Sequence, residues 1–122
     1  MSAHSRPLKN GIPSNLRDSA VIATDTTTNS AAFQVPVHAQ QLIAISTVSA
    51  RTDGTFTTTI QHSDDGVTWY TWKAGSAQSA NGSVLIYDDT IPNFVYVRAS
   101  ILSASTTSGA AVGVKLLYGT QR

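Results

Sequence analysis

Cysteine and glutamate are absent from the 122 residues of this sequence, and only 12% of the residues are charged. Without cysteine the chain has no disulfide, no thiolate metal ligand and no cysteine nucleophile. Because only three histidines are present as well, we expect no structural zinc site. Eight basic residues against seven aspartates give a net charge of +1. That charge is too small to attract a polyanion, so nucleic acid is not an expected partner.

Long hydrophobic runs are absent too. Apolar stretches such as residues 42–45 are far shorter than the roughly 20 residues that a membrane-spanning helix needs. Residues 1–7 contain no apolar segment of the kind found in secretory signals. We therefore expect no membrane partner, and a protein that is made in a cytoplasm and is soluble or becomes part of something assembled there.

Small hydroxyl residues are abundant, with 16 threonines and 15 serines. Residues that favour helices are scarce, whereas β-branched and aromatic residues, which suit strands, are plentiful. Several windows alternate between two faces, for example with Phe56, Thr58 and Ile60 on one side of a strand. Turn residues separate about eight such strands, which we place near residues 20–25, 31–37, 41–50, 55–62, 67–74, 83–88, 93–102 and 110–118.

Short strands at regular spacing predict an all-β fold, namely a single antiparallel β-sandwich that is jelly-roll-like in size. Its core consists of the residues that share one face of each alternating strand. The predicted core residues are Phe56, Ile60, Val95, Val97, Val112, Val114 and Leu116.

Residues 1–19 differ from the rest of the chain. Prolines and a glycine interrupt any regular element, apolar residues are sparse, and basic residues outnumber acidic ones. We therefore divide the chain into an extended basic N-terminal arm, residues 1–19, and a β-sandwich domain, residues 20–122. Such a segment is either a passive tail or an arm that docks on a partner through apolar anchors and basic side chains. The residues expected at this assembly interface are Arg6, Leu8, Lys9, Ile12, Leu16 and Arg17.

Candidate catalytic and metal-binding residues are few. The three histidines show no metal-ligand spacing, and no phosphate-binding or nucleophile motif occurs. The carboxylates include two adjacent pairs, at residues 64–65 and 88–89, where aspartates cap turns rather than face each other across a substrate. We therefore expect no enzyme activity and no cofactor. Whether a calcium ion binds near the two pairs is left open.

The most distinctive stretch is residues 61–72, with the sequence Gln-His-Ser-Asp-Asp-Gly-Val-Thr-Trp-Tyr-Thr-Trp. It is similar to the Asp-box of sialidase-like propellers, but it is one residue shorter between aspartate and glycine and occurs once. Its physical content is a hairpin, with Gly66 at a positive φ and Trp69 packed back on the core. Tyr70 and Trp72 share the other face, where we expect exposed aromatic rings that form an interface or, alternatively, a sugar-binding surface.

The chain from about residue 20 to residue 118 resembles the small β-sandwich structural proteins of tailed bacteriophages. The resemblance rests on the strand at residues 41–48, the stretch at residues 56–69, the late strand at residues 93–99 and a final strand near the C-terminus. That family includes head decoration proteins, head-fibre bases and tail components, and it has no catalytic site to carry over.

The resemblance implies a non-enzymatic virion structural protein that is assembled in the host cytoplasm. The leading interpretation is a capsid decoration (cement) protein. Its expected partners are the major capsid protein or other virion proteins, and copies of itself in a trimer or another symmetric oligomer. The low charge of the chain reduces the desolvation cost of such contacts. The alternatives are a carbohydrate- or receptor-binding module that uses the aromatic face, and a tail or neck component of the particle.

Overall fold

The computed structural model describes residues 9–22, 26–35, 41–88, 92, 94–104 and 110–120. Within these residues the regular elements are all strands: β1 (Lys9–Val21), β2 (Thr27–Asn29), β3 (Phe33–Gln34), β4 (Gln41–Ser49), β5 (Thr55–Ser63), β6 (Tyr70–Ala74), β7 (Gly82–Tyr87), β8 (Tyr96–Ala104) and β9 (Ala111–Thr120). No helix long and apolar enough to cross a bilayer occurs in the described part of the chain. Gly54 and Gly66 have φ values of 83° and 78°, as expected for the two Asp-Gly turns that flank β5.

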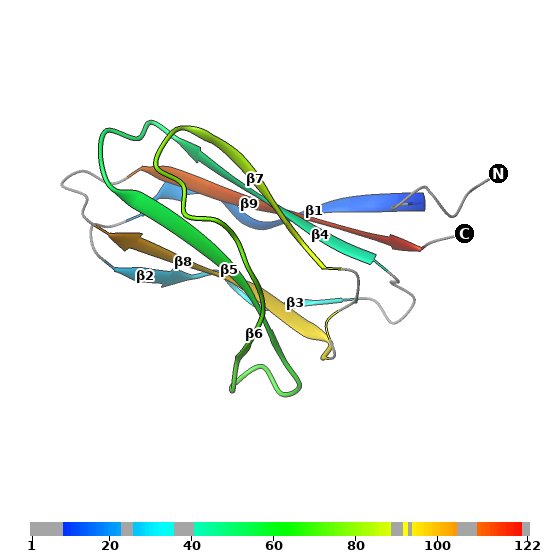
Figure 1. Cartoon of the computed structure of the whole chain (residues 1–122). Coiled ribbons are helices and arrows are strands. Elements are labelled where there is room, and N and C mark those ends of the chain that lie inside the picture. Colours follow the sequence, from blue (N-terminus) through cyan, green and yellow to red (C-terminus); the bar gives the residue numbers. More distant parts are fainter. Residues whose placement is uncertain are drawn as a thin grey trace.

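The strands form two antiparallel sheets that pack face to face (Figure 1). Sheet A has the order β1-β9-β4-β7, and sheet B has the order β2-β8-β5-β6, with β3 also paired to β8. Because β2 and β3 pair with successive parts of β8, they act as one interrupted strand. The chain crosses between the sheets at every connection except those that join β2 to β3 and β5 to β6. The predicted β-sandwich is therefore confirmed, and its strand order is that of a jelly roll.

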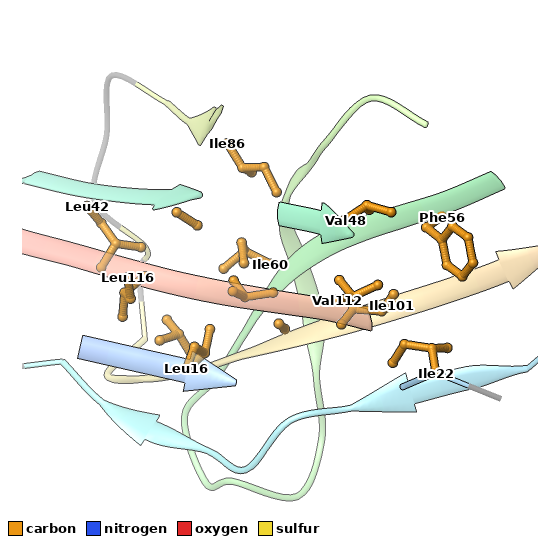
Figure 2. Close-up of a cluster of buried hydrophobic side chains, with 14 of the residues drawn as sticks. Leu16, Ile22, Leu42, Val48, Phe56, Ile60, Ile86, Ile101, Val112 and Leu116 are labelled. Carbon is orange, nitrogen blue, oxygen red and sulfur yellow. The ribbon is translucent and has the colours of Figure 1, made fainter. Parts of the chain in front are cut away.

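The core lies between the two sheets (Figure 2). Strands β4, β5 and β8 alternate between buried and more exposed residues, as a half-buried strand should. Among the buried polar groups, Ser46 Oγ of β4 and Thr58 Oγ1 of β5 lie 2.7 Å apart and form a hydrogen bond across the sandwich. This bond satisfies two hydroxyl groups that would otherwise be costly to bury.

The predicted core residues are buried with one exception. Phe56, Ile60 and Val97 each have 0% exposure, and the three predicted residues of β9 have 1% or less. Val95 is 40% exposed, so its assignment to the core was wrong. The physical reason is that β8 begins at Tyr96. Val95 lies in the bend before the strand, where the alternation that places Val97 inside does not apply.

Strand β1 occupies one edge of sheet A, where the sequence predicted an extended arm. It pairs with β9 from Lys9 opposite Thr120 to Val21 opposite Ala111, through three register shifts. These shifts disturb the period-two pattern that the prediction relied on. Leu16 is 7% exposed and belongs to the core. The boundary expected at residue 19 therefore does not mark a structural break, while residues 1–8 lie outside the described residues.

Arg17 and Gly113 accommodate the irregular part of β1. Arg17 Nε donates a hydrogen bond to the carbonyl oxygen of Val112 at 3.0 Å, and Nη2 donates to that of Ala20 at 3.3 Å. A side chain at Gly113 would place its Cβ only 3.1 Å from the backbone nitrogen of Ser19. The missing side chain therefore lets the bulged β1 backbone lie close to β9, and the Arg17 guanidinium bridges the bulge.

Candidate functional site

The residues predicted for the assembly interface fall in β1 or before it. Four of them belong to β1, namely Lys9, Ile12, Leu16 and Arg17. The other two, Arg6 and Leu8, lie outside the described residues. Leu16 is buried in the core of its own chain, and the Arg17 guanidinium is bonded to two carbonyl groups of its own sheet. These two side chains thus stabilise the sandwich itself rather than extend from it, which differs from the prediction.

An aliphatic surface covers the outer side of sheet A. Residues opposite one another on neighbouring strands project to the same side of a sheet. The register places Tyr87, Ile43 and Leu117 in one row across β7, β4 and β9, and Leu85, Ile45 and the exposed Lys115 in the next row. Leu85 is 58% exposed and Tyr87 is 54% exposed, while Ile43, Ile45 and Leu117 are half-buried. These five apolar residues, without Lys115, are called the sheet A patch below.

A shallow groove of about 450 Å³ lies beside the sheet A patch. Its lining includes Arg17, Ser19, Thr47, Ser83 and Lys115, which come from all four strands of sheet A. The Oγ1 atom of Thr47 and the Oγ atom of Ser83 form a hydrogen bond of 2.8 Å across β4 and β7. Among the lining residues whose side chains the structure describes, two are basic and none is acidic, so this part of the lining is positively charged.

The outer side of sheet B is rich in hydroxyl groups instead. Strand β5 presents alternate threonines there, and Ser100 lies opposite one of them on β8. Leu102 is 51% exposed on this side, but its cross-strand neighbours are Thr57 and Thr27. It is therefore an isolated apolar residue on a polar surface. The two outer faces of the sandwich differ in chemistry, and the aliphatic one belongs to sheet A.

The turn after β5 fixes its own backbone through side-chain hydrogen bonds. Asp65 Oδ1 accepts bonds from the backbone nitrogens of Val67 and Thr68, at 2.8 and 3.0 Å, and from Ser63 Oγ at 3.0 Å. Ser63 Oγ in turn accepts a bond from the nitrogen of Gly66 at 2.9 Å. The bond from Thr68, followed by the one from Val67, holds the pKa of Asp65 below its ordinary value. An ionised carboxylate of this kind caps a turn and is not the protonated acid that a glycosidase needs.

Tyr70 and Trp72 do not share an exposed aromatic face. Tyr70 is 52% exposed, whereas Trp72 is half-buried and packs against the core. The cause is a register shift in which adjacent residues of β5 pair with Lys73 and with Thr71. Trp72 is thus the extra residue of a bulge, and a bulge redirects a side chain. Of the two rings predicted to be exposed, Tyr70 alone projects from the surface.

Trp69 lies under a guanidinium group. Arg98 Cζ is 4.4 Å from the centroid of the Trp69 ring, a cation–π geometry, and Arg98 Nε donates a 2.8 Å hydrogen bond to Gln61 Oε1. This arrangement closes one face of the indole to a ligand. The ring that packs against the core is that of Trp72, not that of Trp69 as the sequence predicted.

His62 is the buried histidine of the described chain. It is 8% exposed, and its ring centroid lies 5.0 Å from that of Phe94, which lies 6.0 Å from that of Tyr70. Its Nδ1 atom is buried and has no hydrogen-bond partner among the described residues. Burial lowers the pKa of His62, because it disfavours the charged imidazolium. His62 is therefore a neutral packing residue near pH 7.

No group of three His, Asp or Glu side chains gathers as a metal site within the ranges that the structure describes. Asp65 is engaged by its own turn, and Asp89 of the second predicted pair lies outside those ranges. The candidate functional surface is consequently the sheet A patch with its groove, and not a cluster of chemically reactive residues.

The sequence carries a signal for the sheet A patch that the prediction did not use. Residues 84–87 read Val-Leu-Ile-Tyr and residues 116–118 read Leu-Leu-Tyr, without alternation. Continuous apolar runs of this kind are typical of strands that are covered on both faces. In this sandwich one face of β7 and β9 packs on the core, and the other face carries the sheet A patch.

No protein-family model matches the chain, and no curated protein matches it significantly. Among solved structures, the PBSX exported protein XepA aligns with 91% of this chain at a TM-score of 0.68 and 13% identity. The chain spans 38% of the length of that protein.

Two further solved structures align at a TM-score of 0.50. One comes from Bacillus endospore appendages, which form a family of disulfide-linked pili, with 13% identity and coverage of 92% of this chain and 89% of the other. The other is PirA, with 12% identity and coverage of 90% and 94%. At these identities the likeness concerns the fold. Disulfide linkage of the pilus kind does not transfer, since this chain has no cysteine.

Proposed function

We propose that this chain is a non-enzymatic structural protein of a bacteriophage particle, where it decorates the head and stabilises it through contacts with capsid subunits and with copies of itself. The observation that carries the proposal is the contrast between the two outer faces of the sandwich. Leu85 and Tyr87 stand more than half exposed on an aliphatic face, whereas the opposite face is rich in hydroxyl groups. Exposed apolar patches mark protein contacts.

The surroundings of the polar residues support the same proposal. Asp65 fixes a turn, Arg17 bridges a bulge, and His62 packs against Phe94. Each of these groups stabilises the sandwich. One of the proteins that share this fold is a pilus protein, which agrees with a structural role.

In this proposal the residues before β1 contact the capsid. Leu16 and Arg17 are engaged within the sandwich, so the anchoring role predicted for the arm is assigned in this proposal to Arg6 and Leu8, the two predicted residues that precede β1. The alternative location for the same structural role is the tail or neck of the particle. A carbohydrate-binding role has less support, because among Trp69, Tyr70 and Trp72 only Tyr70 is more than half exposed.

The test is occupancy on the particle. Purified particles that lack the chain are incubated with the full chain and with its Leu8→Asp variant, and the bound protein is quantified and located by electron microscopy. We expect saturable binding to the head, higher resistance of the head to heat, and weaker binding of the variant. The matched control is Leu102→Asp, which changes an exposed leucine on the polar face of sheet B. Absence of binding to the head would contradict the proposal.

A further inference from the structure

We propose that the outer face of sheet A is the contact between two copies of this chain, related by a two-fold axis that lies in the plane of the interface. This inference rests on the proposed function in so far as both treat the chain as an assembly protein, and it names the partner of one surface. It starts from the sheet A patch, the five apolar residues in two rows that begin at Leu85 and Tyr87 on β7.

The composition of the face is that of an interface centre. Across β7, β4 and β9, the two rows of the patch and the next row, which holds Ser83, Thr47 and Gly113, contain one charged residue, Lys115. Arg17 of β1 adds a second basic group on this face. Depletion of charged residues at the centre, with tyrosine and aliphatic residues present, distinguishes protein interfaces from ordinary surface. Lys115 can direct its ammonium group to the rim along its apolar stem.

The size of the face is close to what a typical stable pair buries on each partner. Strand β4 has nine residues, which corresponds to roughly 30 Å at about 3.3 Å per residue. Four strands at about 4.8 Å spacing are roughly 19 Å wide, so the flat area approaches about 600 Å² before side-chain relief is counted. A typical stable complex buries about 800 Å² on each partner. One face-to-face contact over sheet A comes close to this value.

The relief of the face favours a second copy as the occupant. Leu85 and Tyr87 project from β7 as a ridge, and the groove of about 450 Å³ lies on the same face. Gly113 and Ser19, which lie against each other, are both part of its lining. A two-fold contact brings the ridge of each copy into the groove of the other, so the same surface serves on both sides. A single surface with both a ridge and a neighbouring hollow is self-complementary in this sense.

The charge of the groove makes the arrangement testable. In the proposed contact Leu85 of one copy approaches Arg17 and Lys115 of the other, which line the groove. A positive charge at position 85 should therefore be repelled, whereas a negative one should be tolerated better. The control position is Leu102, which has nearly the same exposure, 51% against 58%, on the opposite face.

The experiment is sedimentation velocity of the full chain from about 1 to 100 μM, a range that detects a micromolar dimer. We expect the unmodified chain to dimerise and Leu85→Lys to weaken dimerisation about tenfold or more, because each dimer contains the change twice. Leu85→Asp should weaken it less, and Leu102→Lys should leave it unchanged. Circular dichroism checks that every variant is folded, which the exposure of both leucines favours.

Three results would overturn the inference: a monomeric chain at about 100 μM, equal losses from Leu85→Lys and Leu102→Lys, or equal losses from the two Leu85 variants. These measurements use the isolated chain, so their failure is separate from failure of the proposed function. A monomer that still binds heads would retain the decoration role and place another protein on sheet A. A dimer that binds no particle would support the two-fold contact and contradict the decoration role.

Discussion

Replacement of Leu16 by alanine tests whether the N-terminal segment is a strand of the sandwich or an arm that waits for a partner. In the structure Leu16 is 7% exposed and lies among the core residues, on the edge strand β1. If residues 9–21 belong to the fold, the substitution removes buried methyl groups and leaves a cavity in the isolated protein. If they form a free arm, the substitution should leave the stability of the isolated protein unchanged.

The expected loss of stability follows from general values. A buried leucine replaced by alanine costs about 2–5 kcal/mol, and we take about 2–3 kcal/mol because an edge strand can relax toward the cavity. For 122 residues the entropy of unfolding is roughly 0.26 kcal/mol/K, so each kcal/mol lowers the midpoint by about 4 °C. The expected decrease in Tm is therefore about 8–12 °C.

The assay is thermal unfolding followed by circular dichroism, at one fixed protein concentration because self-association would shift the midpoint. The matched control is Val21→Ala, since Val21 belongs to the same strand but is 73% exposed. Its Tm should change by about 2 °C or less, in line with the small effects of surface substitutions. If Leu16→Ala and Val21→Ala have the same Tm, the placement of β1 is refuted. Residues 9–19 would then regain their predicted role as part of the arm.

Three further predictions concern the core and the titratable groups. Val97→Asp should unfold the domain, because an unpaired carboxylate at a fully buried site costs several kcal/mol, whereas Val95→Asp at a 40% exposed site should remain folded in circular dichroism. Asp65→Ala should lower the Tm at pH 7 more than at pH 3. The depressed pKa of Asp65 gives stability that is present above the ordinary aspartate pKa of about 3.9 and is lost as the pH falls through the native pKa. Equal losses of Tm at both pH values would contradict this prediction. The lowered pKa of His62 means that the unfolded chain binds a proton first, so stability should fall as the pH drops below about 6.5. A His62→Gln variant should show a flatter Tm profile between about pH 7.5 and 5, and an unchanged slope would show that other groups cause the dependence.

The sequence by itself determined the class of fold and most of the core. Alternation in strands such as β5 and β8 identifies which residues share a face, because the side-chain period of a strand is two. The Asp-Gly turns at Gly54 and Gly66 mark strand ends, since glycine adopts a positive φ without strain. These are local properties, and they can be recognised from the sequence without knowing which strands are neighbours.

Tertiary structure decided what depends on the neighbours. Strand β1 shows little alternation in its sequence, whereas β9 pairs with it and the core between the two sheets receives Leu16. The bulge that turns Trp72 inward depends on the register with β5, which is a contact between strands and not a property of β6. The aliphatic outer face of sheet A exists only because the jelly-roll order places β7, β4 and β9 side by side. Three short apolar runs far apart in the sequence thereby become one surface, since strand pairing is set by long-range packing that the period of a single strand does not encode.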